Sequence, residues 1–581
     1  MRRAVLAVLA ATAVVLAAAG PVFAATLRQD RARASDGVTL QTTLTGQAPL
    51  LARPTLVEFS PYGRASGTLD AGPAYNHLLV QIRGTGDSDG SFDALGPRTQ
   101  RDVAEVLRWA CDQPWSAGRL ALRGFSASAI TIYNSLHLEL PCVEAAVLGS
   151  GTFELYRDLL VPGGVNNLVP GAGVMGLIGV PALAQGLDRI RRDPGSALGV
   201  LGGLLKAGLD ELAHPTLDGW WRARGFRGDV NDLPVLMVGS FFDVESRGAF
   251  QAFQALRDDG AHLLVVGAHD GAPKGTDGGL AASRAWLDHH VRGVDNGAER
   301  EPRVRMLLAD GDREDFTVGG KVVARDAGDW PVPGTRWERL ALDARRSGTS
   351  LSPSAGTLTL GAPAKGGRQS FAALPSIPLQ TDPPNAGIVG GFGINALTSA
   401  LPVLSDMTLS EPLGLSYTTA PLRRDVVAAG PAAVEVDLAT TAPETAVWAV
   451  VSDVDAAGVP HPVASGRLLS SFPEVDEARS LRDASGALVQ PYGDFSRKRP
   501  TAPGRSRRLQ VELWPIGNRF RAGHRIRLTL VGASLASLPT LPGVTTVRLG
   551  GERPSRLLLP VLPESDLPAA LGQARRRARR R

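Results

Sequence analysis

The sequence predicts an α/β domain with a parallel sheet, an inserted helical cap and a C-terminal β-sandwich. Continuous apolar segments predict the sheet, because strands that are buried on both faces have this composition. Amphipathic segments of helical period lie between them, and this alternation is typical of a sheet covered by helices on both faces. The apolar segments are residues 55–59, 77–82, 120–124, 145–150, 234–239 and 262–267.

The pattern changes near Pro302, and this change predicts the sandwich. Short alternating segments such as "VRMLLADG" (304–311) and "RLQVELWP" (508–515) are separated by Gly, Pro and Asp turns. This arrangement is typical of antiparallel strands. We therefore predict a sandwich over residues 301–565 and an α/β domain formed by residues 26–152 and 232–300.

The remaining segment of the α/β half, residues 153–231, is rich in Gly and Leu and has no convincing strand pattern. We interpret it as a helical cap that is inserted over the strand ends. A membrane hairpin is the weaker alternative, because Pro170, Pro181 and the charged "DRIRRD" (188–193) interrupt the apolar run.

Residues 1–25 have the features of a secretory signal peptide. Arg2 and Arg3 precede an apolar run, and small residues then occupy the cleavage positions up to Ala24. A retained membrane anchor is less favoured, because the run is rich in Ala and barely long enough to cross a bilayer. We therefore expect export to a secreted or periplasmic location, with the mature chain beginning near Ala25.

Charge and length limit the partners of the protein. With 581 residues and 44% hydrophobic content, the chain is large enough for more than one core. The formal net charge is +5, and part of it lies in the basic tail (566–581), which ends in "ARRRARRR". The rest is close to neutral, so nucleic-acid binding is not indicated. We interpret the tail as a solvated end, and oligomeric state stays open.

The segment "LALRGFSASA" (120–129) predicts a sharp strand-to-helix turn with Ser126 at its apex. Small residues on either side let the strand and the helix approach, as in a nucleophile elbow. This turn would expose the hydroxyl above the sheet and direct the Ala127 amide at an oxyanion. The alternative is a serine that caps an ordinary helix. The segment also departs from G-x-S-x-G, because Ser128 stands where Gly is usual.

An acid and a base follow later strands in the order that such a serine requires. Asp243 follows the segment 234–239, and His269 follows the segment 262–267. A single Asp or His in a loop has little meaning, whereas the ordered set of three predicts a catalytic triad. Asp218 and Asp270 are the alternative acids.

With these residues in place, the chain resembles the CocE/NonD family of serine hydrolases. This family includes cocaine esterase, α-amino-acid ester hydrolases, cephalosporin acylases and X-prolyl dipeptidyl-peptidases. The resemblance spans nearly the whole mature chain. Its segments are "DGVTL" (36–40), "EFSPYG" (58–63), "IRGTGDSDGSF" (82–92), "RGFSAS" (123–128), "GSFFDV" (239–244), "AWLDHHVRG" (285–293) and "YTTAPL" (417–422).

The resemblance implies an α/β hydrolase fold with a helical cap and a C-terminal jelly roll. It also implies Ser126 as the nucleophile, Asp243 as the acid and His269 as the base. Tyr62 and Ala127 are the implied oxyanion donors. Similar sequences usually carry G-P-W-x-H, whereas His269 follows Gly267 by only two positions, so His289 and His290 are kept as alternative bases.

Other residues carry weaker predictions. "RGTGDSDGSF" (83–92) lacks the endings of a phosphate loop and of a calcium loop, so we interpret it as a structural turn. Trp220 and Trp221 are candidate walls of a substrate pocket, although packing explains adjacent Trp residues equally well. In an exported protein Cys111 and Cys142 are expected to form a disulfide, with two free thiols as the alternative.

The sequence therefore predicts a serine hydrolase that cleaves a small ester, amide or short peptide through an acyl-enzyme, with no metal or organic cofactor. The apolar cap favours uncharged acyl groups. X-prolyl dipeptidyl-peptidase activity is the first alternative, and it would need an acid such as Glu154, Asp158 or Glu211 to recognise the substrate amine. A non-catalytic binding or surface protein on the same scaffold is the second.

Overall fold

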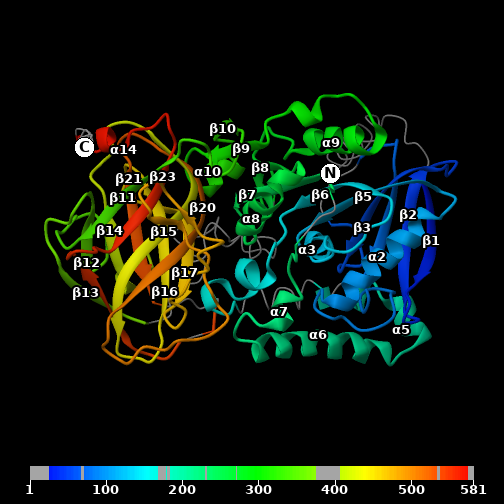
Figure 1. The fold of residues 1–581 in the computed structure, drawn as a ribbon, viewed down its shortest axis with the longest axis horizontal. Helices are drawn as coiled ribbons and strands as arrows, with labels where there is room; N and C mark the ends of the chain where they lie inside the picture. Colours follow the sequence, from blue (N-terminus) through cyan, green and yellow to red (C-terminus); the bar gives the residue numbers. More distant parts are fainter. Residues whose placement is uncertain are drawn as a thin grey trace, which may run out of the picture.

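The computed structural model describes residues 25–573, apart from 67–70, 168–177, 180–182, 229–231, 270, 374–405, 533–536 and 539. The predicted signal segment up to Ala24, the Arg-rich end of the basic tail and the alternative acid Asp270 lie outside the described residues. Figure 1 shows two parts side by side, an α/β part on the right and a part built of strands on the left.

The α/β part is organised around one mixed sheet in the order β1-β2-β4-β3-β5-β6-β7-β8-β9-β10. From β4 to β9 all neighbours are parallel, and antiparallel pairs close both ends. The strands are β1 (Ala25–Arg33), β2 (Thr39–Gln47), β3 (Arg53–Ser60), β4 (Asn76–Gln81), β5 (Ser116–Phe125), β6 (Val143–Gly149), β7 (Val235–Phe242), β8 (His262–Ala268), β9 (Val304–Ala309) and β10 (Val322–Ala327). The six apolar segments of the sequence all lie in or overlap these parallel strands.

Alternate residues of each parallel strand enter two different cores. Leu122 of β5 and Met237 of β7 belong to the core beneath α2 (Pro97–Cys111), α3 (Ala127–Tyr133) and α8 (Ser246–Leu256). Ala121 and Leu236 belong to the core beneath α9 (Leu280–Arg292). Because both faces are covered, apolar residues point to both sides of these strands. The fold is the predicted α/β hydrolase.

The segment between β6 and β7 forms the helical cap. It contains the short π-helix η1 (Tyr156–Leu160), the 3-10 helix η2 (Pro162–Gly164), α5 (Leu187–Arg192), α6 (Ser196–Ala213) and α7 (Gly219–Arg222). Figure 1 places α6 along the lower edge of the α/β part. Within the described ranges, no helix is long and apolar enough to cross a membrane.

The C-terminal strands form a β-sandwich. One run has the order β17-β16-β21-β14-β12-β11, the other has the order β13-β22-β15-β20, and β23 joins β11 to β15. All neighbours are antiparallel except β12 and β14. The strands are β11 (Arg336–Asp343), β12 (Ser354–Leu360), β13 (Gly367–Ala372), β14 (Leu415–Thr418), β15 (Val426–Thr440), β16 (Ala446–Val454), β17 (Pro460–Leu469), β20 (Arg507–Phe520), β21 (Arg525–Val531), β22 (Val544–Leu549) and β23 (Arg556–Val561).

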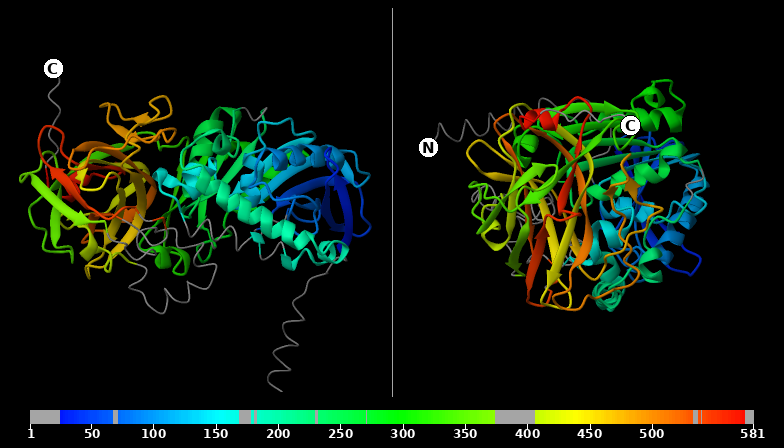
Figure 2. Two further views of the ribbon diagram at one scale, coloured as in Figure 1. Left: turned by 90° about the horizontal axis from the view of Figure 1, so that it is seen from below. Right: turned by 60° about the vertical axis from the view of Figure 1, so that its left-hand side comes forward.

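Smaller elements complete this half. A two-stranded ribbon pairs β18 (Leu481–Arg482) with β19 (Leu488–Gln490), and α14 (Leu567–Ala570) follows β23. In the α/β part, α10 (Arg313–Thr317) connects β9 to β10. The two views of Figure 2 show the sandwich packed along one end of the α/β part.

One predicted strand belongs to a different part of the fold. The segment 304–311 was predicted to open the sandwich, but its strand β9 pairs in parallel with β8, with Leu263 opposite Val304. The prediction was wrong because alternating apolar residues also suit the last parallel strand, which has a neighbour on each side. β9 also touches the sandwich, since Ala309 pairs with Asn518 of β20.

Aromatic packing and a covalent bond add to the core. The Trp330 ring centroid lies 4.4 Å from that of Phe250 on α8, so the segment between β10 and β11 is anchored on the α/β part.

Cys111 and Cys142 are joined by a disulfide, and their Cα atoms are 6.1 Å apart. This bond fixes the end of α2 to the start of β6.

Candidate active site

Ser126 lies at a strained apex between β5 and α3. Its φ of 54° and ψ of −127° place it in a region that residues with a side chain rarely adopt. Its side chain makes no capping hydrogen bond to the helix, which argues against the capping alternative. Gly124 permits this turn, because a Cβ there would lie 2.5 Å from the Ala129 nitrogen.

A buried ion pair supports the turn from below. Arg123 contacts Glu58 at 2.8 Å, and the Ser128 hydroxyl donates to Glu58 over 3.2 Å. The Ser66 hydroxyl donates to the same carboxylate over 2.6 Å. Ser128 therefore has a partner at the position where Gly is usual, and this contact accounts for the departure from G-x-S-x-G.

Asp243 and His269 meet at the ends of β7 and β8. His269 Nδ1 is 2.9 Å from Asp243 Oδ1, and the carboxylate is fully buried. The His269 amide donates to the Phe242 carbonyl over 3.0 Å, and Ala268 and Gly271 exchange backbone hydrogen bonds across the short loop. The shortened base loop therefore holds His269 against the acid.

Electrostatics keep Asp243 ionised. Burial alone would raise the pKa of its carboxyl, but the positive charge and the hydrogen bond of His269 lower the pKa below its usual value. A buried acid that remains charged can orient the imidazole and stabilise it when it takes up a proton.

Tyr62 and Ala127 are directly bonded to one another. The Ala127 amide donates to the Tyr62 hydroxyl oxygen over 3.1 Å. Burial, together with the negative charges of Glu245 and Glu58, raises the pKa of Tyr62 to about 12, so its hydroxyl stays a donor. The two expected oxyanion donors thus lie within one hydrogen bond of each other, beside Ser126.

Glu245 is a site residue that the sequence prediction missed. Its Oε1 lies 3.5 Å from Ser126 Oγ, and its amide donates to Asp243 Oδ1 over 2.8 Å. Burial raises the pKa of Glu245 well above its usual value, despite the nearby His269. Its position two residues after Asp243 in the same loop is the one sequence signal that could have indicated it.

Glu245, Asp243 and His269 offer ligand atoms that all lie within 4.8 Å of one another. Such a group could hold a metal ion. A cation bound by Nδ1 of His269 would have to replace the hydrogen that this atom shares with Asp243. The arrangement fits a triad with an added carboxyl better than a metal centre.

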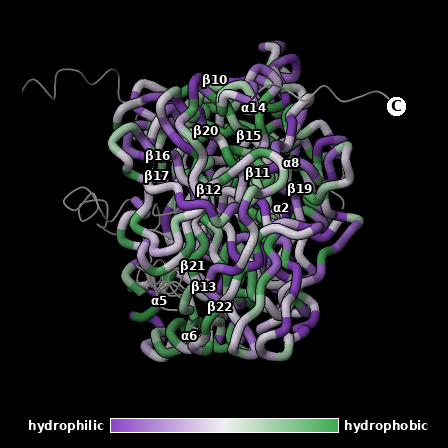
Figure 3. The backbone as a smooth tube through the Cα atoms, turned by 90° about the vertical axis from the view of Figure 1, so that its left-hand side faces the viewer, coloured by the Kyte–Doolittle hydropathy of each residue, from purple (hydrophilic) through white to green (hydrophobic). Residues whose placement is uncertain are grey.

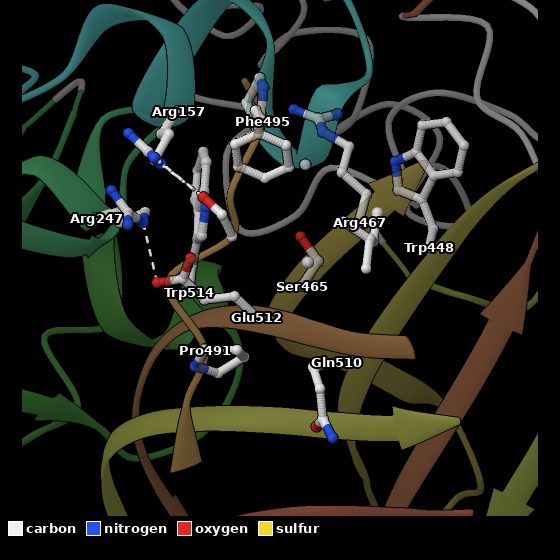
Figure 4. A pocket seen from close by; sticks show the side chains of 15 residues that line it. Arg157, Arg247, Trp448, Ser465, Arg467, Pro491, Phe495, Gln510, Glu512 and Trp514 are labelled. Carbon is white, nitrogen blue, oxygen red and sulfur yellow. Dashed lines mark hydrogen bonds and ion pairs between the residues drawn. The ribbon is translucent and has the colours of Figure 1, made fainter. Parts of the chain in front are cut away.

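A buried charged network joins the site to the cap and the sandwich. Arg247 on α8 contacts Asp158 of the cap at 2.5 Å and Glu512 of β20 at 3.0 Å. Figure 4 shows Arg247 and Glu512 at the wall of a small cavity of about 30 Å³ between these parts. All three parts of the chain therefore meet at Arg247, four residues after the candidate acid Asp243.

The alternative acid and bases have other partners. Asp218 caps α7 and contacts His214 at 2.5 Å. His289 lies 3.3 Å from Glu299, and the His290 ring packs against Trp286 with centroids 4.2 Å apart. The structure therefore does not bring them to Ser126, and Asp243 and His269 remain the acid and base that it brings together.

Trp220 and Trp221 have packing roles in the cap. Trp221 is buried, packs edge-on against Tyr156 and donates its indole N–H to the His214 carbonyl. Trp220 stacks on His214. Among the described residues, their hydrogen bonds and ring contacts are with other cap residues, so the expectation that they wall the substrate pocket has no support.

The turn at 83–92 is structural, as expected. Arg83 pairs with Asp102 of α2, and Asp89 pairs with Arg31 of β1 at 2.8 Å. Arg189 of α5 donates to the carbonyls of Ser88 and Gly90. The Asp89 carboxylate and the backbone carbonyls of the turn therefore hold the turn between the sheet and the cap.

A larger cavity of about 360 Å³ adjoins His269. It lies between the carboxyl ends of β5 to β8 and the segment that leads to α9. Apolar side chains form much of its wall, and His269, Asp277 and several serines add polar groups. The apolar side chains are Phe125, Val147, Val238, Val266, Ala268, Ala272 and Leu280.

The fold and this geometry define an α/β-hydrolase-fold serine hydrolase. Two family models match the chain in order: X-Pro dipeptidyl-peptidase (S15 family) over residues 36–270, and X-Pro dipeptidyl-peptidase C-terminal non-catalytic domain over residues 296–557. The chain belongs to this family of serine hydrolases, which the CocE/NonD resemblance predicted.

Three individual proteins are also similar to this chain. A protein of Mycobacterium bovis named as a serine esterase is 23% identical over an alignment of 562 positions, with 84% of this chain and 83% of the relative covered. A CocE/NonD family hydrolase from Staphylococcus aureus superposes with a TM-score of 0.71 at 16% identity, covering 92% of this chain and 93% of its own. An α-amino acid ester hydrolase gives a TM-score of 0.70 at 15% identity, with 94% and 98% covered.

Proposed function

We propose that this serine hydrolase cleaves esters of uncharged acyl groups through an acyl-enzyme on Ser126. The observation that carries the proposal is the contact of 2.9 Å between Asp243 and His269, next to a serine held in a strained conformation. A serine needs such a base to become nucleophilic, and the base needs such an acid.

Each step of the reaction uses a described residue. Ser126 Oγ attacks the substrate carbonyl carbon while His269 takes the hydroxyl proton, and Asp243 stabilises the imidazolium. The Ala127 amide and the Tyr62 hydroxyl donate to the oxyanion that forms. The intermediate expels the alcohol, which receives the proton from His269. Water, deprotonated by His269, then attacks the acyl-enzyme, and the second intermediate expels Ser126 Oγ, which takes the proton back from His269 as the carboxylic acid leaves.

The charges around the site support uncharged acyl groups. The three acids that the sequence offered for amine recognition already have partners. Glu154 pairs with Arg157 at 2.7 Å, Asp158 pairs with Arg247, and Glu211 accepts a hydrogen bond from Asn166 over 3.0 Å. The esterase name of the curated relatives supports the same substrate class.

Glu245 favours a second candidate, hydrolysis of substrates with a free amine, including X-prolyl peptides. It lies beside Ser126, and a substrate ammonium there would favour its ionised form. Because burial raises its pKa, forming this ion pair requires the loss of its proton, so we rank this candidate second. The family model named for X-Pro dipeptidyl-peptidase supports it.

A fluorophosphonate probe tests the mechanism, because it reacts with an activated serine. We expect labelling of the wild-type protein and of Ser128→Ala, and none of Ser126→Ala, with all three showing the same circular dichroism spectrum. Labelling of Ser126→Ala at another serine would overturn the assignment of the nucleophile.

A side-by-side assay of p-nitrophenyl esters and of Gly-Pro and Ala-Pro anilides tests the substrate class. We expect a higher kcat/KM for short and medium acyl esters, and Glu245→Gln should leave this activity within a few-fold. A preference for the anilides that Glu245→Gln abolishes would establish the second candidate instead.

We further propose that the protein is exported. The basic, apolar and small-residue pattern of residues 1–24 supports export, as does the disulfide between Cys111 and Cys142, because disulfides persist in oxidising compartments. N-terminal sequencing of the protein recovered from outside the cytoplasm of its host should begin near Ala25. Recovery of the full-length chain in the cytoplasm alone would contradict this proposal.

A further inference from the structure

The cap helix α6 presents a stripe of leucines to solvent. Its polar and small residues lie at the sides, whereas Val200 and Leu204 face the protein. Exposed fractions range from 49% for Leu201 to 75% for Leu198, which is unusual for five large apolar residues on one helix. The stripe consists of Leu198, Leu201, Leu205, Leu209 and Leu212.

The spacing of the stripe is symmetric about its central residue. The steps from Leu198 to Leu212 are three, four, four and three residues. At 100° per residue the five side chains fall within an arc of about 80°. Spacings of three and four are those of helices that pair along a seam. If a second α6 runs antiparallel, Leu198 meets Leu212, Leu201 meets Leu209, and Leu205 meets its own copy.

Glycines on both sides of Leu205 leave room for a second helix. Gly202 and Gly208 stand three residues before and after it, and a Cβ built at either would meet no atom within 4 Å. Helices with such gaps can approach closely, and the Leu205 side chain of one copy can enter the space over the glycines of the other. This feature too is symmetric about Leu205.

The position and charge of α6 suit a protein partner. Figures 1 and 2 show α6 on the outer surface of the α/β part, and Figure 3 shows the hydrophobic colour of its chain. Lys206 is the one cation of α6, and Asp210 neutralises it at 2.6 Å. A helix that lies on a membrane surface is usually rich in Lys and Arg beside its apolar face. The stripe lacks this signature.

We propose that the leucine stripe of α6 is the interface through which two copies of this chain form a symmetric dimer. A two-fold axis passes beside Leu205, and each copy contributes the same surface, as closed dimers require. A contact formed mainly by one helix pair is small, so we expect a dissociation constant in the micromolar range. The dimer does not depend on the reaction proposed above.

Analytical ultracentrifugation of the full mature protein tests the dimer across a range of concentrations. Leu205→Glu places two carboxylates opposite each other on the axis, so it should raise the dissociation constant at least roughly tenfold. Leu351→Glu replaces an equally exposed leucine of the sandwich and should leave it unchanged. Both variants should hydrolyse esters at the wild-type rate.

Cysteine cross-linking tests the antiparallel register. The two native cysteines are bonded to each other, so an introduced cysteine is the reactive thiol. With a short bismaleimide, Leu205→Cys should cross-link to itself and Leu198→Cys alone should not. A mixture of Leu198→Cys and Leu212→Cys should cross-link again.

Three results would overturn the proposal. The first is a wild-type monomer at every concentration. The second is a dimer that survives Leu205→Glu unchanged, since another surface would then form it. The third is a monomer that floats with phosphatidylglycerol vesicles and loses this binding in Leu205→Glu, which would make the stripe a membrane-contact surface.

Discussion

The backbone amide of Ala127 donates to the hydroxyl oxygen of Tyr62 over 3.1 Å, so the two groups expected to stabilise the oxyanion are bonded to each other. An oxyanion would replace the tyrosine oxygen as the acceptor of this amide, and the tyrosine would turn its own O–H toward the same charge. Forming the oxyanion would therefore exchange the hydrogen bond between Ala127 and Tyr62 for one hydrogen bond from each group to the new charge.

Replacing Tyr62 with Phe should reduce kcat by about 10²- to 10³-fold with little change in KM, because the lost hydrogen bond strengthens only in the transition state. Steady-state kinetics on a p-nitrophenyl ester measures both constants. Tyr75→Phe is a matched control, since the Tyr75 hydroxyl bonds to Asp288. A change confined to KM would place Tyr62 in substrate binding.

Asp243→Asn should lower kcat by about 10⁴-fold, because an amide at this position favours the wrong tautomer of His269. The same ester assay measures the loss. Asp218→Asn, which changes a carboxylate bonded to His214 in the cap, should leave kcat near the wild-type value. A nearly silent Asp243→Asn would mean that another carboxylate orients the histidine.

Glu245→Gln should change how stability depends on pH. The folded protein holds the pKa of Glu245 well above its usual value, whereas the unfolded chain loses this proton near pH 4. Between pH 4 and the raised pKa, the folded state of the wild type binds more protons than the unfolded chain. Its free energy of unfolding therefore falls as the pH rises.

The variant has no such proton, so its stability relative to the wild type should increase with pH, by up to about 1.4 kcal/mol per unit. Urea denaturation at pH 5, 6, 7 and 8 measures the difference. Glu477→Gln alters an exposed carboxylate that pairs with Arg482, which stays charged over this range, and should give a constant difference. A constant difference for Glu245→Gln as well would mean that Glu245 is ionised in the folded protein.

Asp310→Asn should weaken the junction between the α/β part and the sandwich. Burial favours the neutral acid, but Arg521 and Arg519 hold the pKa of Asp310 at about 2. Its stabilisation is therefore present above pH 4 and is lost as the pH falls from about 4 to about 2.

At neutral pH we expect a loss of about 1 to 2 kcal/mol, since both arginines are partly exposed and solvent screens them. Denaturation curves at pH 7 and pH 2.5 should differ between the two proteins at the higher pH and converge at the lower. Glu564→Gln, which removes a surface pair with Arg325, should have little effect. An equal loss at both pH values would show that packing, rather than charge, is responsible.

Local sequence was sufficient for the parallel strands and for the residues at their ends. Ser126, Asp243 and His269 follow apolar segments, and the order of strands in a sheet brings such positions together. Glu245 was missed because its burial depends on distant packing, and its one sequence signal, a position two residues after Asp243, is ordinary for a loop. The partners of Arg247 lie 89 and 265 residues away, which no local pattern reveals.

The prediction for β9 failed for a related reason, and the tryptophans were equally open to two interpretations. The alternating residues of β9 suit a strand of either half, and only its neighbours in the sheet decide between them. Adjacent tryptophans indicate burial but not the surface that they cover.

Because β9 continues the sheet of one half and touches β20 of the other, the boundary between the halves runs through hydrogen-bonded backbone. A chain that stopped before Val304 would leave β8 as a bare outer strand, able to recruit strands of other molecules. A division of the chain near residue 300 by proteolysis, gene fission or domain shuffling would therefore cut into the α/β sheet, and a clean division would have to fall after β10.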